Sequence, residues 1–266
     1  MSRAHNVDGR RGAPRGRRGR IACGFVALTA LLGVAASACS SNSGPSEGAL
    51  AGKSATAILS LSVKAYHRQS SVTFATKTIA GKASTLQTGA TSKDAASESV
   101  SSSKLPVLQA VLVGGTVYLR AGSQFLEQQL GLSTAQAAAH SGQWISFQKG
   151  DPGFSTISQS LSAGEAIVSF VPEEPHLRVA GAVTFQHQSA VAVTGSPASA
   201  PAAGTVATVT LFVSTTAPYL PLGATVQVNQ NTGQSIERIA SVYGKYNKKV
   251  DPKAPTGSIP ITSLTS

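Results

Sequence analysis

The sequence predicts an α+β fold in which a curved antiparallel β-sheet packs against a few helices. Segments that alternate apolar and polar residues occur on both sides of a helix-rich stretch at residues 125–161. Glycine-containing turns join several neighbouring segments, and a segment of helical period precedes them all at residues 55–66. This order of one helix, a meander, a helical insertion and a second meander is typical of an antiparallel sheet packed against helices.

Residues 1–38 have the three parts of a secretory signal peptide. Seven arginines lie within residues 1–20, an apolar run of 18 residues follows, and this run ends in small residues before Cys39. Eighteen residues is about the shortest run that can span a bilayer, so an uncleaved transmembrane anchor is the alternative. Polar residues, without basic stop-transfer residues, follow Cys39 and favour cleavage.

The end of this leader, Ala36, Ser37, Ala38 and Cys39, resembles a bacterial lipobox, whose cysteine is diacylglyceryl-modified and becomes the mature N-terminus. Cys39 is then the lipid anchor, and residues 39–54 form a flexible, lipidated tether. Cys39 is also the one cysteine left after residues 1–38 are removed. Ala36 replaces the usual leucine, so cleavage by ordinary signal peptidase, followed by secretion, is the alternative.

The net charge of +11 is concentrated in the leader. Residues 1–20 contribute seven arginines and one aspartate, a net +6, and the remaining 246 residues carry +5. Nucleic-acid binding needs clustered Lys and Arg on the folded part, so we expect no nucleic-acid partner. The chain after residue 38 is long enough for a hydrophobic core without disulfides.

The first part of the mature chain is predicted as one helix followed by strands. Residues 55–66 repeat apolar side chains every three or four positions, which indicates an amphipathic helix. Alternation then predicts strands at residues 71–78 and 82–88. The polar residues 91–103 are expected to form an exposed edge strand or a mobile loop.

Residues 105–119 are the most apolar segment of the mature chain, and Gly114 with Gly115 predicts a tight hairpin turn within it. Apolar side chains alternate between the two faces of the first predicted strand: Val107, Val111 and Val113 on one face, and Leu108, Ala110 and Leu112 on the other. Both faces of this hairpin are therefore expected to be covered.

The rest of the chain is predicted as a helical stretch and a second meander. Ser133 is expected to cap the second helix and Gly142 to stop it. The predicted helices are at residues 125–132, 134–140 and 154–161, with a short strand at 144–147. Further strands are predicted at residues 179–187, 189–194, 205–214, 224–229 and 235–242. Residues 195–204, with two prolines and four alanines, are expected to be a flexible loop.

No catalytic or metal-binding motif stands out in the mature chain. Glu173 and Glu174 lie between two prolines, which predicts a solvated turn, and no nucleophile elbow occurs. Four histidines are scattered without the spacing of a metal site: His67, His140, His176 and His187. We therefore expect no enzyme activity, no cofactor and no metal. An enzyme would need a serine, a histidine and an acid brought together by the fold.

Three stretches together carry a family resemblance. They are VLVGGTVYLR at residues 111–120, GQWI at residues 142–145 and LFVSTTAPYLPLG at residues 211–223. Their order along the chain resembles the actinobacterial LppX and LprG lipoprotein family, which is similar in fold to the LolA and LolB lipoprotein carriers. Leu222 stands where family members often carry a basic residue, and Tyr243 replaces the usual tryptophan.

The resemblance implies a half-barrel sheet around a hydrophobic cavity that holds acyl chains of lipids or glycolipids, as a carrier or chaperone. The lipid-binding domain is expected at residues 55–250 and a C-terminal tail at residues 251–266. The implied location is the extracytoplasmic face of the cell membrane. The implied partners are the membrane, through N-terminal acyl chains, a lipid or glycolipid ligand, and an envelope transporter.

Six apolar residues are the best candidates for the lining of such a cavity: Val107, Val111, Val113, Leu119, Leu130 and Phe170. Periodicity does not distinguish a lined cavity from a filled core. The alternative is therefore a non-enzymatic envelope scaffold or interaction module with the same fold and a filled core. Such a module would present the loops predicted at residues 91–103 and 195–204 to a partner.

Overall fold

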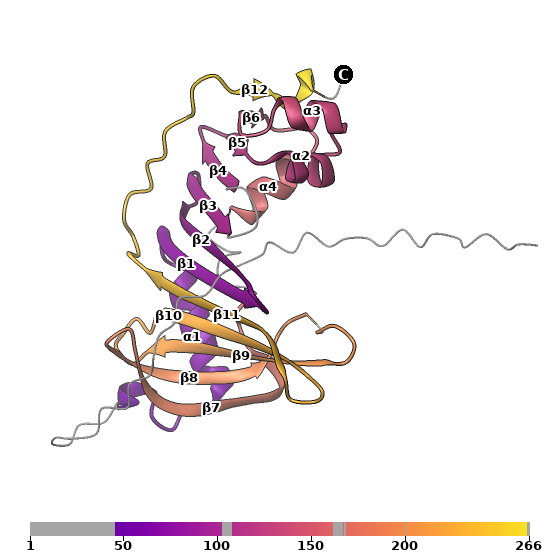
Figure 1. The fold of residues 1–266 in the computed structure, drawn as a ribbon. Coiled ribbons are helices and arrows are strands. Elements are labelled where there is room, and N and C mark those ends of the chain that lie inside the picture. Colours follow the sequence, from indigo (N-terminus) through magenta and orange to yellow (C-terminus); the bar gives the residue numbers. More distant parts are fainter. Residues whose placement is uncertain (1–45, 103–107, 162–166, 168, 200, 265–266) are drawn as a thin grey trace, which may run out of the picture.

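A computed structural model describes residues 46–102, 108–161, 167, 169–199 and 201–264. These residues form one open, curved sheet of 12 strands, four α-helices and two short 3-10 helices (Figure 1). All strand pairs are antiparallel except one short parallel pair near the C-terminus. The α+β fold predicted from the sequence is confirmed.

The first helix and the first meander, apart from its third strand, lie where the sequence predicts them. Helix α1 (Ala55–His67) begins at Ser54, whose hydroxyl accepts a hydrogen bond of 3.2 Å from the backbone N–H of Ala57. Five strands follow in order: β1 (Ser71–Ala80), β2 (Ala83–Ser92), β3 (Ala96–Ser102), β4 (Leu108–Val113) and β5 (Thr116–Arg120).

Strand β3 corrects the expectation for residues 91–103, which was an edge strand or a loop. It pairs with β2 on one side and with β4 on the other, so it is an interior strand. The serines at alternate positions made this segment look polar. They point to one side of the sheet, while Ala96, Glu98 and Val100 point to the other.

The helical stretch follows β5 as predicted. Ser133 and Gln136 form a capping box at the start of the second helix, and Gly131 ends the first helix with a φ of 69°. The elements are α2 (Ser123–Leu130), α3 (Thr134–Ala139), β6 (Trp144–Phe147) and α4 (Phe154–Ser160).

The second meander contains five strands: β7 (Glu173–Phe185), β8 (Gln188–Ser196), β9 (Thr205–Ser214), β10 (Pro221–Gln230) and β11 (Ser235–Gly244). Its last strand returns to the first meander, so that Phe74 of β1 lies opposite Tyr243 of β11. This pairing joins both meanders into one sheet, which Figure 1 shows as a continuous ladder from β6 to β7.

Part of the expected C-terminal tail, residues 259–264, contributes to the fold. Strand β12 (Ile259–Pro260) pairs in parallel with β6 and forms one edge of the sheet. The 3-10 helix η2 (Ile261–Ser263) follows, and Ile261 and Leu264 are buried. An element of two or three residues has no detectable period, so the sequence pattern did not predict these contacts.

The segment expected as tether also enters the fold at its end. The 3-10 helix η1 (Gly48–Leu50) places Leu50 in the core, where 1% of its surface is exposed. The predicted signal peptide, residues 1–38, and the predicted anchor Cys39 lie outside the described residues. Among the helices that the structure describes, none is both long and apolar enough to cross a membrane.

Candidate functional site

Strand pairing places both hydrophobic clusters of the protein on one face of the sheet, which we call the inner face. Residues directly opposite each other on neighbouring strands point to the same side. One row of opposite residues runs from β6 to β11: Ile145, Leu119, Ala110, Glu98, Gly89, Phe74 and Tyr243. A second row runs from β4 to β7: Leu108, Val100, Gln87, Thr76, Ser241, Ala224, Leu211, Val193 and Val179.

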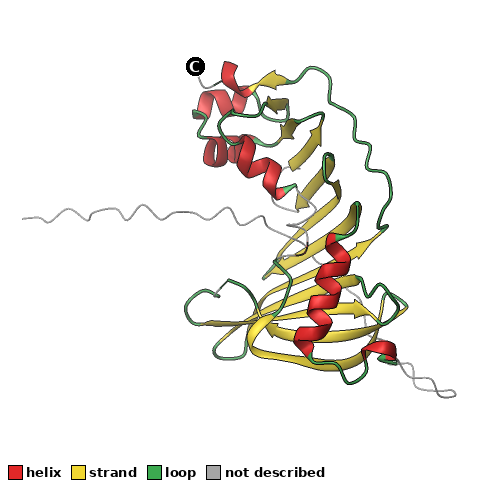
Figure 2. Ribbon diagram, turned by 180° about the vertical axis from the view of Figure 1, so that it is seen from behind, coloured by secondary structure: helices red, strands yellow, loops and turns green. Residues whose placement is uncertain are grey.

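The helices α2, α3 and α4 lie at one end of the inner face, where α4 packs on β5 (Figure 2). Leu126 of α2 and Phe147 of β6 have no exposed surface. We call the apolar residues gathered here the helical cluster, and its larger members are Leu108, Val117, Leu119, Leu126, Leu132, Ile145, Phe147, Ile157, Leu161, Ile261 and Leu264.

Helix α1 lies at the other end of the inner face and packs on β7, β8, β9 and β10 (Figure 2). Ile58 of α1 and Leu211 of β9 have no exposed surface. We call this group the α1 cluster, and its larger members are Leu50, Ile58, Leu59, Tyr66, Val72, Ile167, Val191, Val193, Leu211, Val213 and Tyr243. Each fully buried aliphatic side chain of this kind contributes about 1.5–3 kcal/mol of transfer free energy.

Leu161 and Ile167, six positions apart in the sequence, belong to different clusters. Leu161 is buried in the helical cluster, and its carbonyl accepts a hydrogen bond of 2.6 Å from the hydroxyl of Thr91 on β2. Ile167 is buried in the α1 cluster. The two clusters are therefore linked by a short stretch of sequence as well as by the sheet.

Between the clusters, the inner face carries polar side chains on β1, β2, β3 and β11. We call this region the central polar strip, and its residues are Thr76, Thr78, Thr85, Gln87, Glu98 and Ser241. All of these except Gln87 are buried. The hydroxyl groups of Thr76 and Ser241 lie 2.7 Å apart and are hydrogen-bonded. The inner face is thus apolar at both ends and polar in the middle.

Glu98 is the one acidic residue among the buried side chains of the described chain, with 7% of its surface exposed. The side-chain amide of Gln87 donates a hydrogen bond of 2.8 Å to its carboxylate. Burial raises the pKa of Glu98 from 4.5 to about 7, and the hydrogen bond from Gln87 acts in the opposite direction. Reasoning from the sequence missed Glu98 because it lay in a predicted edge strand or loop. Ala96, Glu98 and Val100 occupy alternate positions, and this spacing was the available sign that all three lie on one face of a strand.

Phe74 marks the border between the central polar strip and the α1 cluster. Its ring packs against that cluster and lies over Gly89, where an added Cβ would come within 2.5 Å of the Phe74 ring. Gly89 is directly opposite Glu98 on the neighbouring strand. The absence of a side chain at position 89 therefore lets an aromatic ring extend toward the buried carboxyl group.

Three tyrosines lie together at the α1 end. The rings of Tyr66 and Tyr246 meet edge to face at 6.3 Å, and the Tyr246 hydroxyl donates a hydrogen bond of 2.5 Å to the carbonyl of Pro221. Burial raises the pKa of Tyr66, Tyr246 and Tyr243 above the ordinary value. These phenols therefore stay neutral at physiological pH and act as packing groups.

The structure separates the residues predicted to line a cavity. Leu119 is buried in the helical cluster, and Leu130 packs against that cluster from α2. Phe170 packs against the α1 cluster at the other end of the sheet. Val107 lies outside the described residues. Leu119 and Leu130 thus belong together, whereas Phe170 belongs to the opposite end.

Val111 and Val113 of β4 lie on the outer face of the sheet. Their neighbours Leu108 and Ala110 are buried in the helical cluster, and Leu112 packs against it. Side chains alternate between faces along a strand, so the two valines point away from that cluster. Both are half-buried. The alternation predicted for this strand is confirmed, but the inward set is the one that contains Leu108, Ala110 and Leu112.

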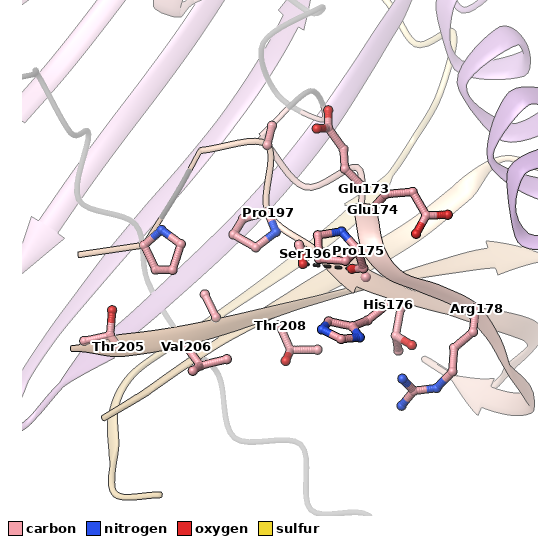
Figure 3. A pocket seen from close by; sticks show the side chains of 15 residues that line it. Glu173, Glu174, Pro175, His176, Arg178, Ser196, Pro197, Thr205, Val206 and Thr208 are labelled. Atoms are coloured by element: carbon pink, nitrogen blue, oxygen red, sulfur yellow. Dashed lines mark hydrogen bonds between the residues drawn. The ribbon is translucent and has the colours of Figure 1, made fainter. Parts of the chain in front are cut away.

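A separate pocket of about 660 Å³ lies among β7, β8 and β9 near the loop after Ser196 (Figure 3). Its lining mixes two carboxylates with a histidine and an arginine, all from β7: Glu173, Glu174, His176 and Arg178. The Ser196 hydroxyl donates a hydrogen bond of 2.9 Å to the Pro175 carbonyl. Both glutamates are exposed, and Pro197, Pro201 and Val206 also line the pocket, so it presents charged and apolar groups side by side.

The histidines do not assemble a chemical site. The described ranges contain no group of three or more His, Cys, Asp or Glu residues that could hold a metal ion. His187 lies in the tight turn between β7 and β8 with a φ of 62°, and not within a strand as predicted. His140 caps α3 and lies 3.1 Å from the side chain of Gln143.

Comparison with protein-family models and with curated proteins gives no match. Solved structures do resemble this chain. Mycobacterium tuberculosis lipoprotein LppX has a TM-score of 0.46 and 13% identity, covering 74% of this chain and 97% of LppX. An uncharacterized conserved protein from Thermus thermophilus has a TM-score of 0.40 and 12% identity, covering 77% and 97%.

A third similar structure is a domain described as a putative outer membrane lipoprotein-sorting protein domain from Vibrio parahaemolyticus. Its TM-score is 0.30 at 9% identity, and the match covers 74% of this chain and 95% of the domain. The structural neighbours thus include LppX and a lipoprotein-sorting domain. At TM-scores of at most 0.46, these likenesses support no conclusion about what this chain binds.

Proposed function

We propose that this chain is a non-enzymatic cell-envelope lipoprotein that binds acyl chains of a lipid or glycolipid, as a carrier or chaperone. One observation supports the proposal above all others. A single continuous sheet face is apolar at both ends, and helices cover each end. A lipid bound along this face would place its acyl chains against the apolar side chains at either end and its polar group near the middle.

An acyl chain is a suitable ligand because the binding free energy grows with each buried methylene. Each buried CH₂ contributes about 0.8 kcal/mol, so ten would give roughly 8 kcal/mol before ordering costs. Ile58 of α1 and Leu126 of α2 have no exposed surface, so helix side chains occupy the two ends in this structure. We infer that ligand chains exchange places with helix side chains as the helices move away from the sheet.

The lining that we propose follows the inner face. It keeps Leu119, Leu130 and Phe170 from the sequence-based candidates, which pack in or against the two clusters. It takes Leu108 and Leu112 of β4 in place of Val111 and Val113, because the latter two lie on the outer face. The lining thus has two apolar ends, one beneath α1 and one beneath α2 to α4.

We further propose that residues 1–38 are a signal peptide and that Cys39 carries the membrane anchor. Leu50 is fixed in the α1 cluster, so the free tether shortens to residues 39–47. Nine extended residues reach at most roughly 30 Å. The α1 end of the sheet would therefore stay close to the extracytoplasmic face of the membrane, within reach of lipids and of a membrane transporter.

A second candidate function is an envelope scaffold or interaction module with a filled core. Two observations favour it: both clusters are packed in this structure, and the pocket near Ser196 presents mixed charges to solvent. Only one of the two loops expected to serve such a module is present, because residues 96–102 are the interior strand β3.

Native mass spectrometry separates the two functions. The mature chain with Cys39→Ser, which cannot be acylated, is purified from its native envelope and sprayed under non-denaturing conditions. A lipid-binding protein retains a copurifying lipid mass or gains one from added lipid. A chain that carries no lipid and takes up none would leave the scaffold as the better account.

A further inference from the structure

The middle of the inner face has an unusual charge composition. The inward positions of β1, β2, β3 and β11 hold no lysine or arginine among the described residues, and their acidic side chains are Glu98 and Glu237. Glu237 lies at the end of the face, opposite Ala80, and is half-buried. Among the described residues, Glu98 is therefore the one ionisable acidic group in the middle of the inner face.

Glu98 has acceptor capacity beyond its bond to Gln87. A carboxylate has about four lone-pair sites, and one of its oxygens, Oε1, receives the Gln87 amide at 2.8 Å. Above its raised pKa of about 7, Glu98 is a charged acceptor, and hydrogen bonds to a buried charged acceptor are stronger than those between neutral groups. A ligand hydroxyl beside Glu98 would therefore donate a strong hydrogen bond to the carboxylate. The bond from Gln87 on the neighbouring strand holds this carboxylate in place.

The strip also contains a polar atom that has no partner among the described residues. The hydroxyl of Thr78 is buried and makes no hydrogen bond there. Thr78 is opposite Thr85, and Gln87 lies two positions further along the same face of β2. Glu98 and Thr78 are two strand spacings apart across the sheet and four residues apart along the strand direction. The distance between them is therefore on the order of 15 Å.

We propose that the central polar strip binds the uncharged, hydroxyl-bearing headgroup of an amphipathic lipid, with Glu98 as its principal acceptor. This inference rests on the proposed function, since the acyl chains of the same lipid would lie against the two flanking clusters. Phe74 borders the strip beside Gly89 and provides an apolar surface for the junction between headgroup and chain.

The charges on the middle of the inner face disfavour a phosphate headgroup. Phosphate recognition relies on Arg, Lys or backbone N–H donors. The inward positions of the four central strands contain no such cation among the described residues, and the backbone N–H groups of interior strands are engaged in the sheet. Above about pH 7, where Glu98 is ionised, a phosphate beside it would also meet a second negative charge. Glycerol and sugar hydroxyls fit this surface because they donate hydrogen bonds without bringing charge.

A vesicle extraction assay tests the inference. Mature protein with Cys39→Ser is mixed with vesicles that contain tracer amounts of dioleoylglycerol, monoglucosyl dioleoylglycerol, dioleoylphosphatidylglycerol or methyl palmitate, and the lipid in the protein fraction is measured. We expect the hydroxyl-bearing uncharged lipids to be extracted about tenfold better than the phosphatidylglycerol. The glucosyl and glycerol arms identify which hydroxyl source is preferred.

Three variants locate the effect. Glu98→Leu should remove the preference between headgroups, whereas Glu98→Gln, which keeps an acceptor oxygen, should retain most of it. Thr78→Val, which has nearly the same shape as the native residue, should weaken the preference and serves where Glu98→Leu does not fold.

Equal extraction of all lipids by the native protein and the variants would overturn the headgroup site and leave acyl binding intact. Failure to extract even methyl palmitate would contradict the proposed function itself.

Discussion

The side-chain amide of Gln87 on β2 donates a hydrogen bond of 2.8 Å to the carboxylate of Glu98 on β3. The two residues are diagonal neighbours, because Gln87 is opposite Val100 and Glu98 is opposite Gly89. The bond therefore lies on the inner face, between two apolar clusters. Burial raises the pKa of Glu98 to about 7, so the group holds its proton at a pH where an exposed glutamate has lost it.

The pH dependence of unfolding should report on Glu98. Below about pH 4.5 the group is protonated in both states, and as the pH rises to about 7 the unfolded chain loses this proton first. Stability should therefore fall over this range, by an amount on the order of 3 kcal/mol, and then remain level. Glu98→Gln should remove that fall and be the more stable protein above neutral pH.

Urea unfolding at several pH values measures this effect. The exposed Glu174 offers a matched control, because Glu174→Gln removes a carboxyl group without touching the inner face. Equal pH slopes for the native protein and Glu98→Gln would show that Glu98 is not buried in the folded state in solution.

Gly89→Ala should destabilise the protein because its methyl group would come within 2.5 Å of the Phe74 ring. Forced displacement of a packed ring costs about 1–3 kcal/mol. Phe74→Leu in the same chain should recover part of that loss, since a smaller side chain leaves room for the methyl group. A double-mutant cycle measured by chemical denaturation gives the coupling energy. Strictly additive effects would mean that the ring does not lie over Gly89.

Leu264→Ala should destabilise the fold although it lies in the expected C-terminal tail. Leu264 is buried in the helical cluster, and removing a buried leucine typically costs about 2–5 kcal/mol. Leu86→Ala is the matched control because Leu86 is 48% exposed on β2, and we expect it to cost less than about 1 kcal/mol. Thermal unfolding compares the two variants. Equal melting temperatures would show that residues 259–264 do not pack on the domain.

Cys39 should carry the lipid anchor. In cells grown with labelled palmitate, the native chain should be labelled and fractionate with the membrane, and globomycin should cause the uncleaved precursor to accumulate. Cys39→Ser should remove both the label and the membrane association. An unlabelled chain in the medium would instead indicate cleavage at Ala36 to Ala38 by ordinary signal peptidase.

The element order was predictable because most strands alternate clearly and serines cap two of the four described α-helices. Ser133 caps α3 as predicted, Ser54 caps α1, and Gly114 with Gly115 makes the hairpin between β4 and β5. Strand β3 was missed as an interior strand because its serines resemble a loop. Strand β12 was missed because two residues carry no period.

The candidate site was only partly predictable, because alternation assigns residues to two faces without saying which face is covered. Of the cavity candidates, Leu119 packs in the helical cluster and Val111 lies on the outer face, a difference that the pattern did not decide. Glu98 becomes significant only through the register of β2, β3 and β4, which places it in one row with Ala110 and Gly89. Such long-range register follows from packing and is not encoded in a local segment.

The lipid content of a matched pair of aspartate variants tests the central claim most directly. Val100 of β3 lies on the inner face beside the helical cluster, and Val111 of the neighbouring strand lies on the outer face. Both valines are half-buried, so each aspartate brings a comparable cost to folding. Native mass spectrometry of both folded variants gives the fraction with bound lipid. We expect Val100→Asp to lose occupancy by more than about tenfold and Val111→Asp to keep it within about twofold. Equal occupancy in the two variants would contradict an acyl-binding site on the inner face.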